Sequence, residues 1–248
     1  MDRWRYFDIT HTNHEVLNPL SNSSLDELIE LISPLDGGRV LDIACGKAEP
    51  LTRIVERYGV SAVGVDLSPP FVDAARKRLA ERVPGADVEI VEVDGAKYEP
   101  AGEPFDAALC LGASWIWDGY EGTLKALSRF VRRGGLVVSG EPYWKQPPVR
   151  EYLEREDLRA DTFGTHRQNV ETGLGLGLVP EYALVSAVED FDRYEALQWR
   201  AAERFAVAHP DDQDLADVQE RCRASRDTYL KWGRDTLGWA VYVFATPI

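Results

Sequence analysis

Cysteine is scarce in this chain, which has three cysteines among its 248 residues. Cys45, Cys110 and Cys222 stand far apart and form no C-x-x-C pair. Closely spaced cysteines are the usual mark of disulfide frameworks in small secreted domains and of structural zinc sites. The sequence therefore indicates neither of these, and we expect no metal site.

Positively charged residues are also few, since the chain has 28 Lys and Arg residues and 42 Asp and Glu residues. Its formal net charge is therefore −14. A protein that follows a phosphate backbone needs a basic face, and the nearest approach to one is the pair Arg132-Arg133. We therefore expect no nucleic-acid partner. The chain also lacks a signal-peptide pattern and an apolar run long enough to span a bilayer, so we expect no membrane partner and a cytoplasmic location.

One stretch, from Val40 to Pro50, is typical of a strand, a tight turn and the start of a helix. The apolar run Arg39–Ile43 predicts a buried parallel strand, and Gly46 allows a ligand to approach the turn closely. The helix expected over Glu49–Tyr58 would direct its free N–H groups at that ligand. Asp66 ends the next apolar run, roughly 20 residues beyond the turn, where an acid suits ribose hydroxyls. The pattern predicts a nucleoside site.

The turn argues against a dinucleotide, whose G-x-G-x-x-G fingerprint lets the backbone approach a pyrophosphate. Here the turn has one glycine, Gly46. Asp42 and Glu49 flank it with carboxylates that would repel a diphosphate and suit a cationic ligand instead. A nicotinamide cofactor is therefore disfavoured.

Five segments, in order and suitably separated, resemble the motifs of the class I S-adenosylmethionine-dependent methyltransferases, whose cofactor carries a sulfonium and no phosphate. They are Val40 to Gly46 as the first motif, Asp66 as the acid of the second, Asp94-Gly95-Ala96 as the adenine-contacting motif, 105–112 as the fourth strand and 133–139 as the turn into the fifth. Any one of them is a weak signal, but together they are specific. The aromatic residues that follow further resemble a bacterial small-molecule methyltransferase subgroup.

The resemblance implies an α/β fold, with a doubly wound, mostly parallel seven-stranded sheet (the Rossmann-like class I methyltransferase fold) and an antiparallel last strand. It implies S-adenosyl-L-methionine as cofactor and S-adenosyl-L-homocysteine as product. The residues expected to bind the cofactor are Asp42, Ala44, Cys45, Gly46, Asp66, Leu67, Asp94, Gly95, Ala96, Leu111 and Gly112.

We expect a single domain over residues 1–248 with three parts. An N-terminal arm and helix (1–34) lies over the site, and the cofactor-binding core (35–145) follows. Strands are expected at 181–188 and 240–245, and apolar residues at helical spacing over 190–209 and 214–234 predict two helices between them. The insertion 189–239 is therefore interpreted as a helical lid.

Aromatic residues and three polar ones supply the candidates for the acceptor side of the site. Because ligands of open α/β sheets collect beyond the carboxyl ends of the strands, we expect Glu141, Tyr143 and His14 to be the candidate general bases, in that order. Glu141 can equally be a structural acid. The residues expected to contact the acceptor are Trp115, Trp144, Tyr194, Trp199 and Trp232.

The leading hypothesis is an enzyme that methylates O, N or S of a small-molecule acceptor. A nicotinamide-dependent oxidoreductase is the first alternative, and binding of NADH without S-adenosylmethionine would favour it. A non-catalytic S-adenosylmethionine-binding sensor is the second, and binding without turnover would favour that. The sequence leaves open whether the protein is a monomer or a homodimer.

Overall fold

The computed structural model describes residues 1–33 and 37–248. The boundary expected between the arm and the core, at residues 34 and 35, lies outside the described residues. The centre of the molecule is a seven-stranded sheet in the order β3-β2-β1-β4-β5-β7-β6. Its strands are β1 (Arg39–Ile43), β2 (Ser61–Asp66), β3 (Val88–Glu92), β4 (Phe105–Leu111), β5 (Val131–Trp144), β6 (Val179–Val185) and β7 (Leu237–Ala245).

The sheet is parallel except at β7, which runs antiparallel to both β5 and β6. The chain moves outward from β1 through β2 to β3 and then returns to β4 on the other side of β1. This reversal between β1 and β4 leaves a crevice at the carboxyl ends of the strands, which is where open α/β sheets bind ligands. The α/β fold with an antiparallel last strand is confirmed.

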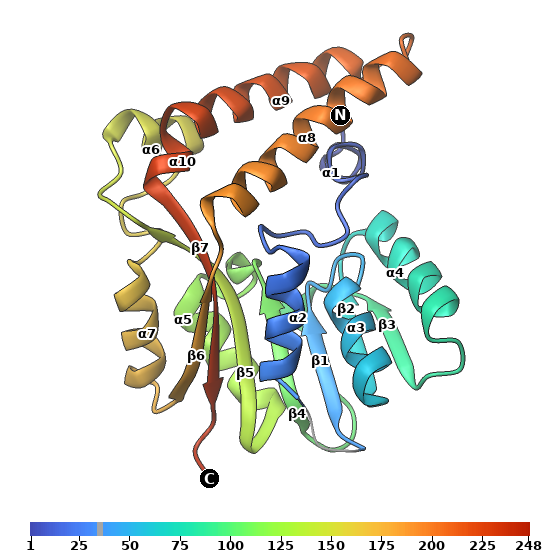
Figure 1. Cartoon of the computed structure of the whole chain (residues 1–248), viewed down its shortest axis with the longest axis vertical. Helices are drawn as coiled ribbons and strands as arrows, with labels where there is room; N and C mark the ends of the chain where they lie inside the picture. The colour runs from blue at the N-terminus through green and yellow to red at the C-terminus, as the bar shows by residue number, and fades with distance from the viewer. Residues whose placement is uncertain (34–36) are drawn as a thin grey trace.

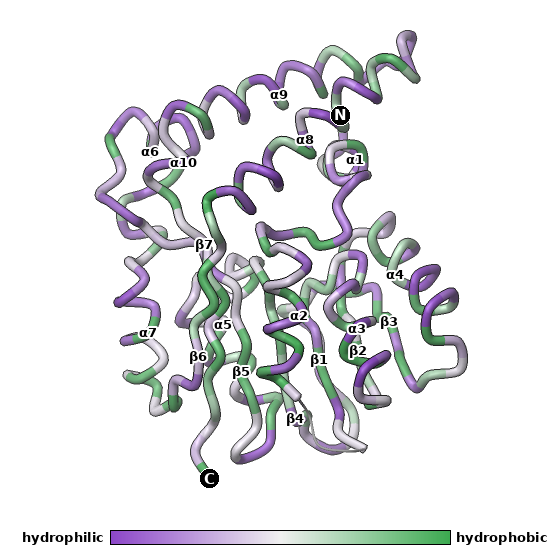
Figure 2. The backbone as a smooth tube through the Cα atoms, viewed as in Figure 1, coloured by the Kyte–Doolittle hydropathy of each residue, from purple (hydrophilic) through white to green (hydrophobic). Residues whose placement is uncertain are grey.

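Helices cover both faces of the sheet (Figure 1). One apolar core joins it to α2 (Asn22–Leu31), α3 (Glu49–Tyr58) and α4 (Pro69–Arg82), and a second joins it to α5 (Tyr120–Phe130) and α7 (His166–Gly175). Figure 2 shows the hydrophobic residues concentrated along the central strands. Burial on both faces explains why these strands are continuous apolar runs in the sequence.

A layer of helices lies across the carboxyl end of the sheet (Figure 1). It consists of α1 (Arg3–Thr10), α6 (Arg150–Glu156), α8 (Val188–Ala208) and α9 (Leu215–Thr228), and α9 continues through a π-helical turn (Tyr229–Gly233) into α10 (Arg234–Thr236). The two helices expected in the insertion are thus present as α8 and α9. Ile9 of α1 packs with Ala202 of α8 and Val218 of α9, so the N-terminal arm and the insertion form one layer.

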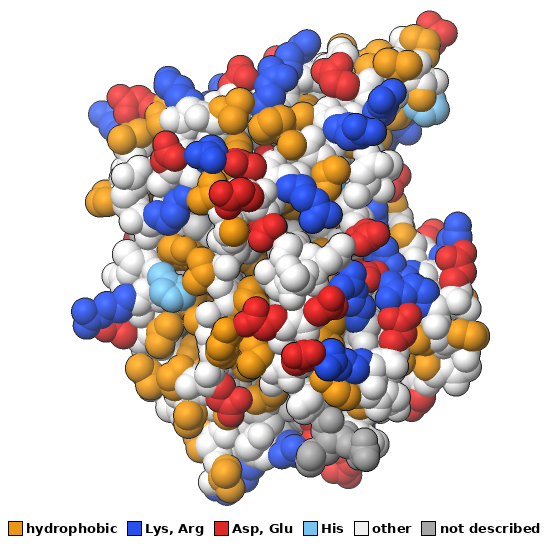
Figure 3. All heavy atoms as spheres, viewed as in Figure 1, with side chains coloured by type: hydrophobic (Ala, Val, Ile, Leu, Met, Phe, Trp, Pro, Cys, Tyr) orange, Lys and Arg blue, Asp and Glu red, His pale blue; other side chains and the backbone are white. Residues whose placement is uncertain are grey.

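The outer face shown in Figure 3 carries acidic and basic side chains interspersed with apolar ones. Part of this mixture is an ion-pair cluster that joins three helices. Arg53 of α3 pairs with Asp26 of α2, and Arg82 of α4 pairs with Glu56 of α3. These contacts tie the helices to one another on one side of the cofactor turn.

Candidate functional site

A cavity of about 610 Å³ opens at the reversal point of the sheet. The residues that come from the ends of β1, β2 and β4 and from the short 3₁₀ helix after β3 form its core-side wall. Every residue that the sequence assigned to the cofactor lines it, namely Asp42, Ala44, Cys45, Gly46, Asp66, Leu67, Asp94, Gly95, Ala96, Leu111 and Gly112. The topology therefore gathers these dispersed segments into one wall.

The turn after β1 has an unusual backbone. Ala44, Gly46 and Ala48 all have positive φ, at 57°, 55° and 56°. Two alanines thus adopt the left-handed conformation that glycine takes more readily, at a cost of roughly 1 kcal/mol each. A Cβ on Gly46 would also lie 2.6 Å from Leu17 Cδ1 of the arm. Glycine is favoured there by the approach of the arm as well as by its φ.

Asp66 is fixed by backbone hydrogen bonds. Its carboxylate accepts from the N–H groups of Gly46 and Ser68, both at 2.8 Å. Burial raises the pKa of Asp66, while the backbone bonds oppose that rise. Each carboxylate oxygen keeps a further acceptor site, so the residue can still receive two ribose hydroxyls. The carboxylate also holds the cofactor turn against β2.

Asp42 and Glu49, which the sequence paired as ligand-facing acids, differ in the structure. Asp42 is 2% exposed, and its Oδ1 has no hydrogen-bond partner. Burial, and next the charge of Asp66, raise the pKa of Asp42 well above its usual range. An unpartnered buried oxygen of this kind is stabilised by a cationic ligand group. Asp42 therefore fits the ammonium and sulfonium end of S-adenosylmethionine.

Glu49 is already neutralised by arginines. It is bonded by Arg53 Nε at 2.6 Å, Arg78 Nε at 3.1 Å and Arg82 Nη1 at 2.6 Å. Burial opposes ionisation of this carboxyl, but the hydrogen bonds from Arg82 and Arg53 outweigh it and lower its pKa. The expectation that Glu49 presents a free negative charge to the ligand is corrected, since that charge anchors α3 to α4.

The opposite wall of the cavity comes from the arm, α4, α8 and the link after β4. Its aromatic and imidazole side chains are Trp4, Phe7, His11, Phe71, Trp115 and Tyr194. Of the residues expected to contact the acceptor, Trp115 and Tyr194 line this cavity. Trp115 is 76% exposed and lies at the rim.

Lys47 connects this wall to the cofactor turn, a role that the sequence did not suggest. Its Nζ donates to the carbonyl oxygens of His11 at 2.8 Å and His14 at 3.3 Å. Burial lowers the pKa of Lys47. Arg78 in turn donates to the Lys47 carbonyl oxygen. The one signal in the sequence is a lysine directly after the turn glycine, which by itself does not identify its acceptors.

None of the three candidate bases lines the large cavity. Glu141 is 1% exposed and lies on the α5 side of β5, where its Oε1 accepts from Ser114 Oγ at 3.1 Å. Burial raises the pKa of Glu141 to about 8. Tyr143 has its ring 5.3 Å from that of His166 and against Gly238. Glu141 thus supports the segment that carries Trp115 from behind.

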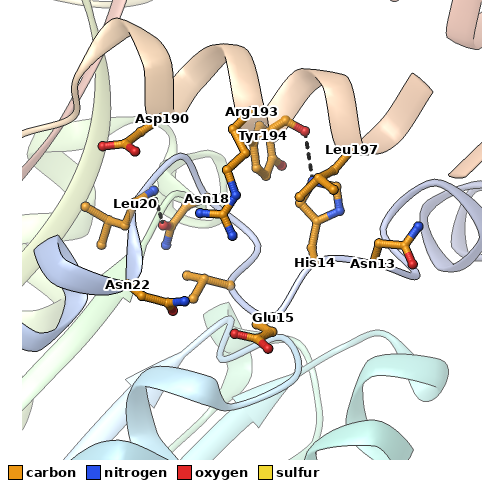
Figure 4. Close-up of a pocket in the computed structure, with 11 residues that line it drawn as sticks. Asn13, His14, Glu15, Asn18, Leu20, Asn22, Asp190, Arg193, Tyr194 and Leu197 are labelled. Carbon is orange, nitrogen blue, oxygen red and sulfur yellow. Dashed lines mark hydrogen bonds between the residues drawn. The ribbon is translucent and has the colours of Figure 1, made fainter. Parts of the chain in front are cut away.

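His14 lines a smaller polar pocket of about 180 Å³ between the arm and α8 (Figure 4). Its Nε2 donates to the carbonyl oxygen of Tyr194 at 2.9 Å. The neighbouring His11 lines the large cavity instead. The arm leaves the helix after Thr10, and the two imidazoles line different pockets although their ring centroids lie 4.8 Å apart.

Trp144, Trp199 and Trp232 also lie outside the large cavity, in contrast to the sequence-based expectation. Trp144 donates its indole N–H to the Ala160 carbonyl oxygen at 3.0 Å, and Trp232 stacks on Tyr152 of α6. Trp199 packs in the apolar cluster between α1, α8 and α9. All three indoles hold the helical layer together.

The described residues, 1–33 and 37–248, contain no group of three or more His, Cys, Asp or Glu side chains that could hold a metal ion. Within the same residues, no helix is long and apolar enough to cross a membrane.

Comparison with known proteins agrees with this geometry. Residues 40–135 match the model of the methyltransferase domain family. The chain is 31% identical to the uncharacterized protein YjhP of Escherichia coli over 98% of each chain. The X-ray structure of YjhP has a TM-score of 0.90, with 98% of this chain and 99% of that one covered.

Two further crystal structures, each determined with S-adenosyl-L-homocysteine, are also similar. An S-adenosylmethionine-dependent methyltransferase from Geobacter sulfurreducens is 29% identical, with a TM-score of 0.91 and 98% of both chains covered. Another from Thiobacillus denitrificans is 29% identical, with a TM-score of 0.90, 98% of this chain and 99% of that chain covered. With the five motifs, the sheet order and the cavity in agreement, the chain belongs to the class I S-adenosylmethionine-dependent methyltransferases.

Proposed function

We propose that this methyltransferase transfers the methyl group to O, N or S of a small-molecule acceptor that binds under the aromatic wall. The observation that carries the proposal is the continuity of the cavity. One space is lined by the cofactor residues on one side and by Trp4, Phe7, Phe71 and Trp115 on the other. Its volume of about 610 Å³ lies within the roughly 300–1,000 Å³ common for small-ligand sites.

The core-side wall supports binding of the cofactor from end to end. Asp66, Asp94 and Ala96 line the cavity, where Asp66 would accept hydrogen bonds from the ribose hydroxyls and the other two would contact the adenine. Asp42 would bind the positively charged end, because its buried Oδ1 has no hydrogen-bond donor among the described residues. S-adenosylmethionine would supply an activated methyl group on a sulfonium. When the methyl group is transferred, the sulfur keeps the bonding electrons and becomes a neutral thioether.

The chain's own contribution to the reaction is mainly positioning. Holding a nucleophile in line and close to the reacting carbon can supply about 7–11 kcal/mol of the barrier reduction. The arm and α8 line the acceptor side of the cavity, and their apolar and aromatic groups would help to keep water away from the reacting atoms. A base is needed only where the acceptor must lose its proton.

The proposal is tested by calorimetric titration with S-adenosylmethionine, S-adenosylhomocysteine and NADH. We expect the first two to bind and NADH not to bind. The Asp42→Asn variant removes the carboxylate charge with little change in shape, so both adenosyl ligands should bind at least tenfold more weakly. Asp26→Asn, on the exposed surface of α2, is the matched control and should bind like the wild type.

Transfer is then measured with methyl-labelled S-adenosylmethionine and a panel of small phenols, amines and thiols. Label in one of these acceptors supports the proposal. Binding without transfer to any of them would favour the sensor hypothesis, and NADH binding alone would favour the oxidoreductase. Transfer only to a basic peptide would assign a protein substrate and overturn the small-molecule proposal.

A further inference from the structure

Tyr194 of α8 is bonded to the arm twice, once through its backbone and once through its side chain. Its carbonyl oxygen accepts from His14 Nε2 at 2.9 Å, the contact drawn in Figure 4. Its hydroxyl lies 3.1 Å from His11 Nε2. Tyr194 and His11 both line the large cavity, and the ring of Tyr194 is 4.9 Å from that of His14. The phenol is therefore fixed in the wall of the site.

The hydrogen-bond partners of His11 determine which ring nitrogen carries its proton. His11 Nδ1 lies 3.1 Å from the carbonyl oxygen of Phe7, which can only accept. The proton is therefore on Nδ1. Thr10 Oγ1, 3.0 Å from the same nitrogen, donates its own proton to the Tyr6 carbonyl oxygen and is consistent with this tautomer.

His11 Nε2 must then act as an acceptor. Burial, and next the nearby His14, lower the pKa of His11 to about 3, so the imidazole is neutral at physiological pH. Burial also raises the pKa of Tyr194, which keeps its phenol protonated. Among the described residues, His11 Nε2 is the hydrogen-bond partner of the Tyr194 hydroxyl, so the phenol proton is donated to that nitrogen. The phenol oxygen is left with lone pairs alone to offer to a ligand.

We infer that the Tyr194 oxygen binds the acceptor by receiving a hydrogen bond from the group to be methylated. The acceptor is then a molecule whose nucleophilic atom carries a proton, as O–H, N–H or S–H. The rest of the molecule is apolar or aromatic and contacts the surrounding rings. Acceptors without such a proton, such as thioethers and tertiary amines, lack this contact. Tyr194 touches the substrate, and His11 is a positioning residue that fixes the direction of the hydroxyl. The inference rests on the proposed function and specifies its substrate.

The test compares phenol with anisole in the S-adenosylhomocysteine complex by ligand-observed NMR titration. The two probes share a ring, but only phenol can donate a hydrogen bond. One neutral hydrogen bond contributes about 0.5–1.5 kcal/mol, so phenol should bind the wild type roughly two- to tenfold more tightly. Tyr194→Phe should abolish that preference while S-adenosylhomocysteine binds as before.

His11→Leu should bring the two probes closer to equal binding, because the freed Tyr194 proton can then be donated to the oxygen of either one. A purely structural role for His11 would weaken both probes alike and leave their ratio unchanged. Tyr242→Phe is the matched control, since the Tyr242 hydroxyl also bonds a histidine, His166 Nδ1 at 3.0 Å, outside the cavity. It should retain the preference for phenol.

Equal binding of the two probes by the wild type, no binding of phenol, or a preference that survives in Tyr194→Phe would overturn the inference and leave the proposed function standing. Failure of S-adenosylhomocysteine itself to bind would overturn both. The two failures are therefore distinguishable.

Discussion

Replacing Lys47 by methionine tests how strongly the cofactor turn holds the arm. Methionine keeps most of the apolar length of the side chain and removes the ammonium group. Two hydrogen bonds are lost, one to the His11 carbonyl oxygen at 2.8 Å and a longer one to that of His14 at 3.3 Å. Both carbonyl groups belong to the segment that follows α1 and covers the cavity.

The expected cost follows from these distances. A hydrogen bond from a charged donor contributes about 1.5–3 kcal/mol. We assign the full contribution to the 2.8 Å bond and a small one to the 3.3 Å bond. Burial of the charged ammonium group, which also lowers the pKa of Lys47, cancels part of the stabilisation from these bonds. We estimate a net loss of about 2 kcal/mol in the free energy that keeps the arm closed, which is roughly a 30-fold increase in its opening equilibrium.

Hydrogen exchange measures that equilibrium directly. The backbone N–H groups of His11 and His14 are bonded within the arm, to Phe7 and His11 carbonyl oxygens. Their protection factors should fall about 30-fold in Lys47→Met, while those of β1 and β4 stay within about twofold. Lys77→Met, an exposed lysine of α4 with only a long ion pair, is the control. Unchanged arm protection, or an equal loss in Lys77→Met, would refute the assignment of Lys47 as the link.

Two further predictions concern the core near the cavity. Burial raises the pKa of Glu141 in the folded protein to about 8. Between about pH 5 and pH 8 the folded protein therefore keeps a proton that the unfolded chain has released. The free energy of unfolding should fall as the pH rises through this range. Glu141→Gln should reduce the dependence of the unfolding free energy on pH by up to about 1.4 kcal/mol per pH unit, measured by urea denaturation at several pH values. An identical pH dependence in both proteins would contradict the assignment of Glu141 as a buried acid. Gly46→Ala and Gly59→Ala introduce the same left-handed strain, at φ 55° and 63°, but only the former meets Leu17. Gly59→Ala should lower the stability measured in thermal melts by about 1 kcal/mol, and Gly46→Ala should lower it further. Adding Leu17→Ala to Gly46→Ala should remove the difference between the two. Equal losses in the two glycine variants would show that the arm does not contact the turn closely.

The core of the fold could be predicted from the sequence because its signals are local. The strand β1 and the helix α3 have the bounds that their apolar patterns predicted. The cofactor residues follow from these elements, since the ends of parallel strands meet at one edge of the sheet. The segment 133–139 was expected to be the turn into the fifth strand, but β5 already begins at Val131, and its pairing with β7 extends it to Trp144.

The residues on the proposed acceptor side of the cavity could not be predicted in the same way. Contacts between segments far apart in the sequence determine which side chains line it. Trp115 and Trp144 look alike in the sequence, yet one lies at the rim of the cavity and the other donates to Ala160. His11 and His14 are three residues apart and line different pockets. Their roles depend on where α8 crosses the arm, which neither segment encodes alone.

This crossing also limits how the enzyme can be recombined with its relatives. The cofactor wall of the cavity, together with Phe71 and Trp115, comes from the segment between Asp42 and Ile116, whereas the remaining lining residues come from the arm up to Asn18 and from Tyr194 of α8. Exchanging the arm alone would separate the two histidines from the tyrosine that they bind. A functional chimera therefore has to inherit the arm and α8 from the same parent, and a segment between them taken from another relative has to keep Lys47 and Gly46, which contact the arm.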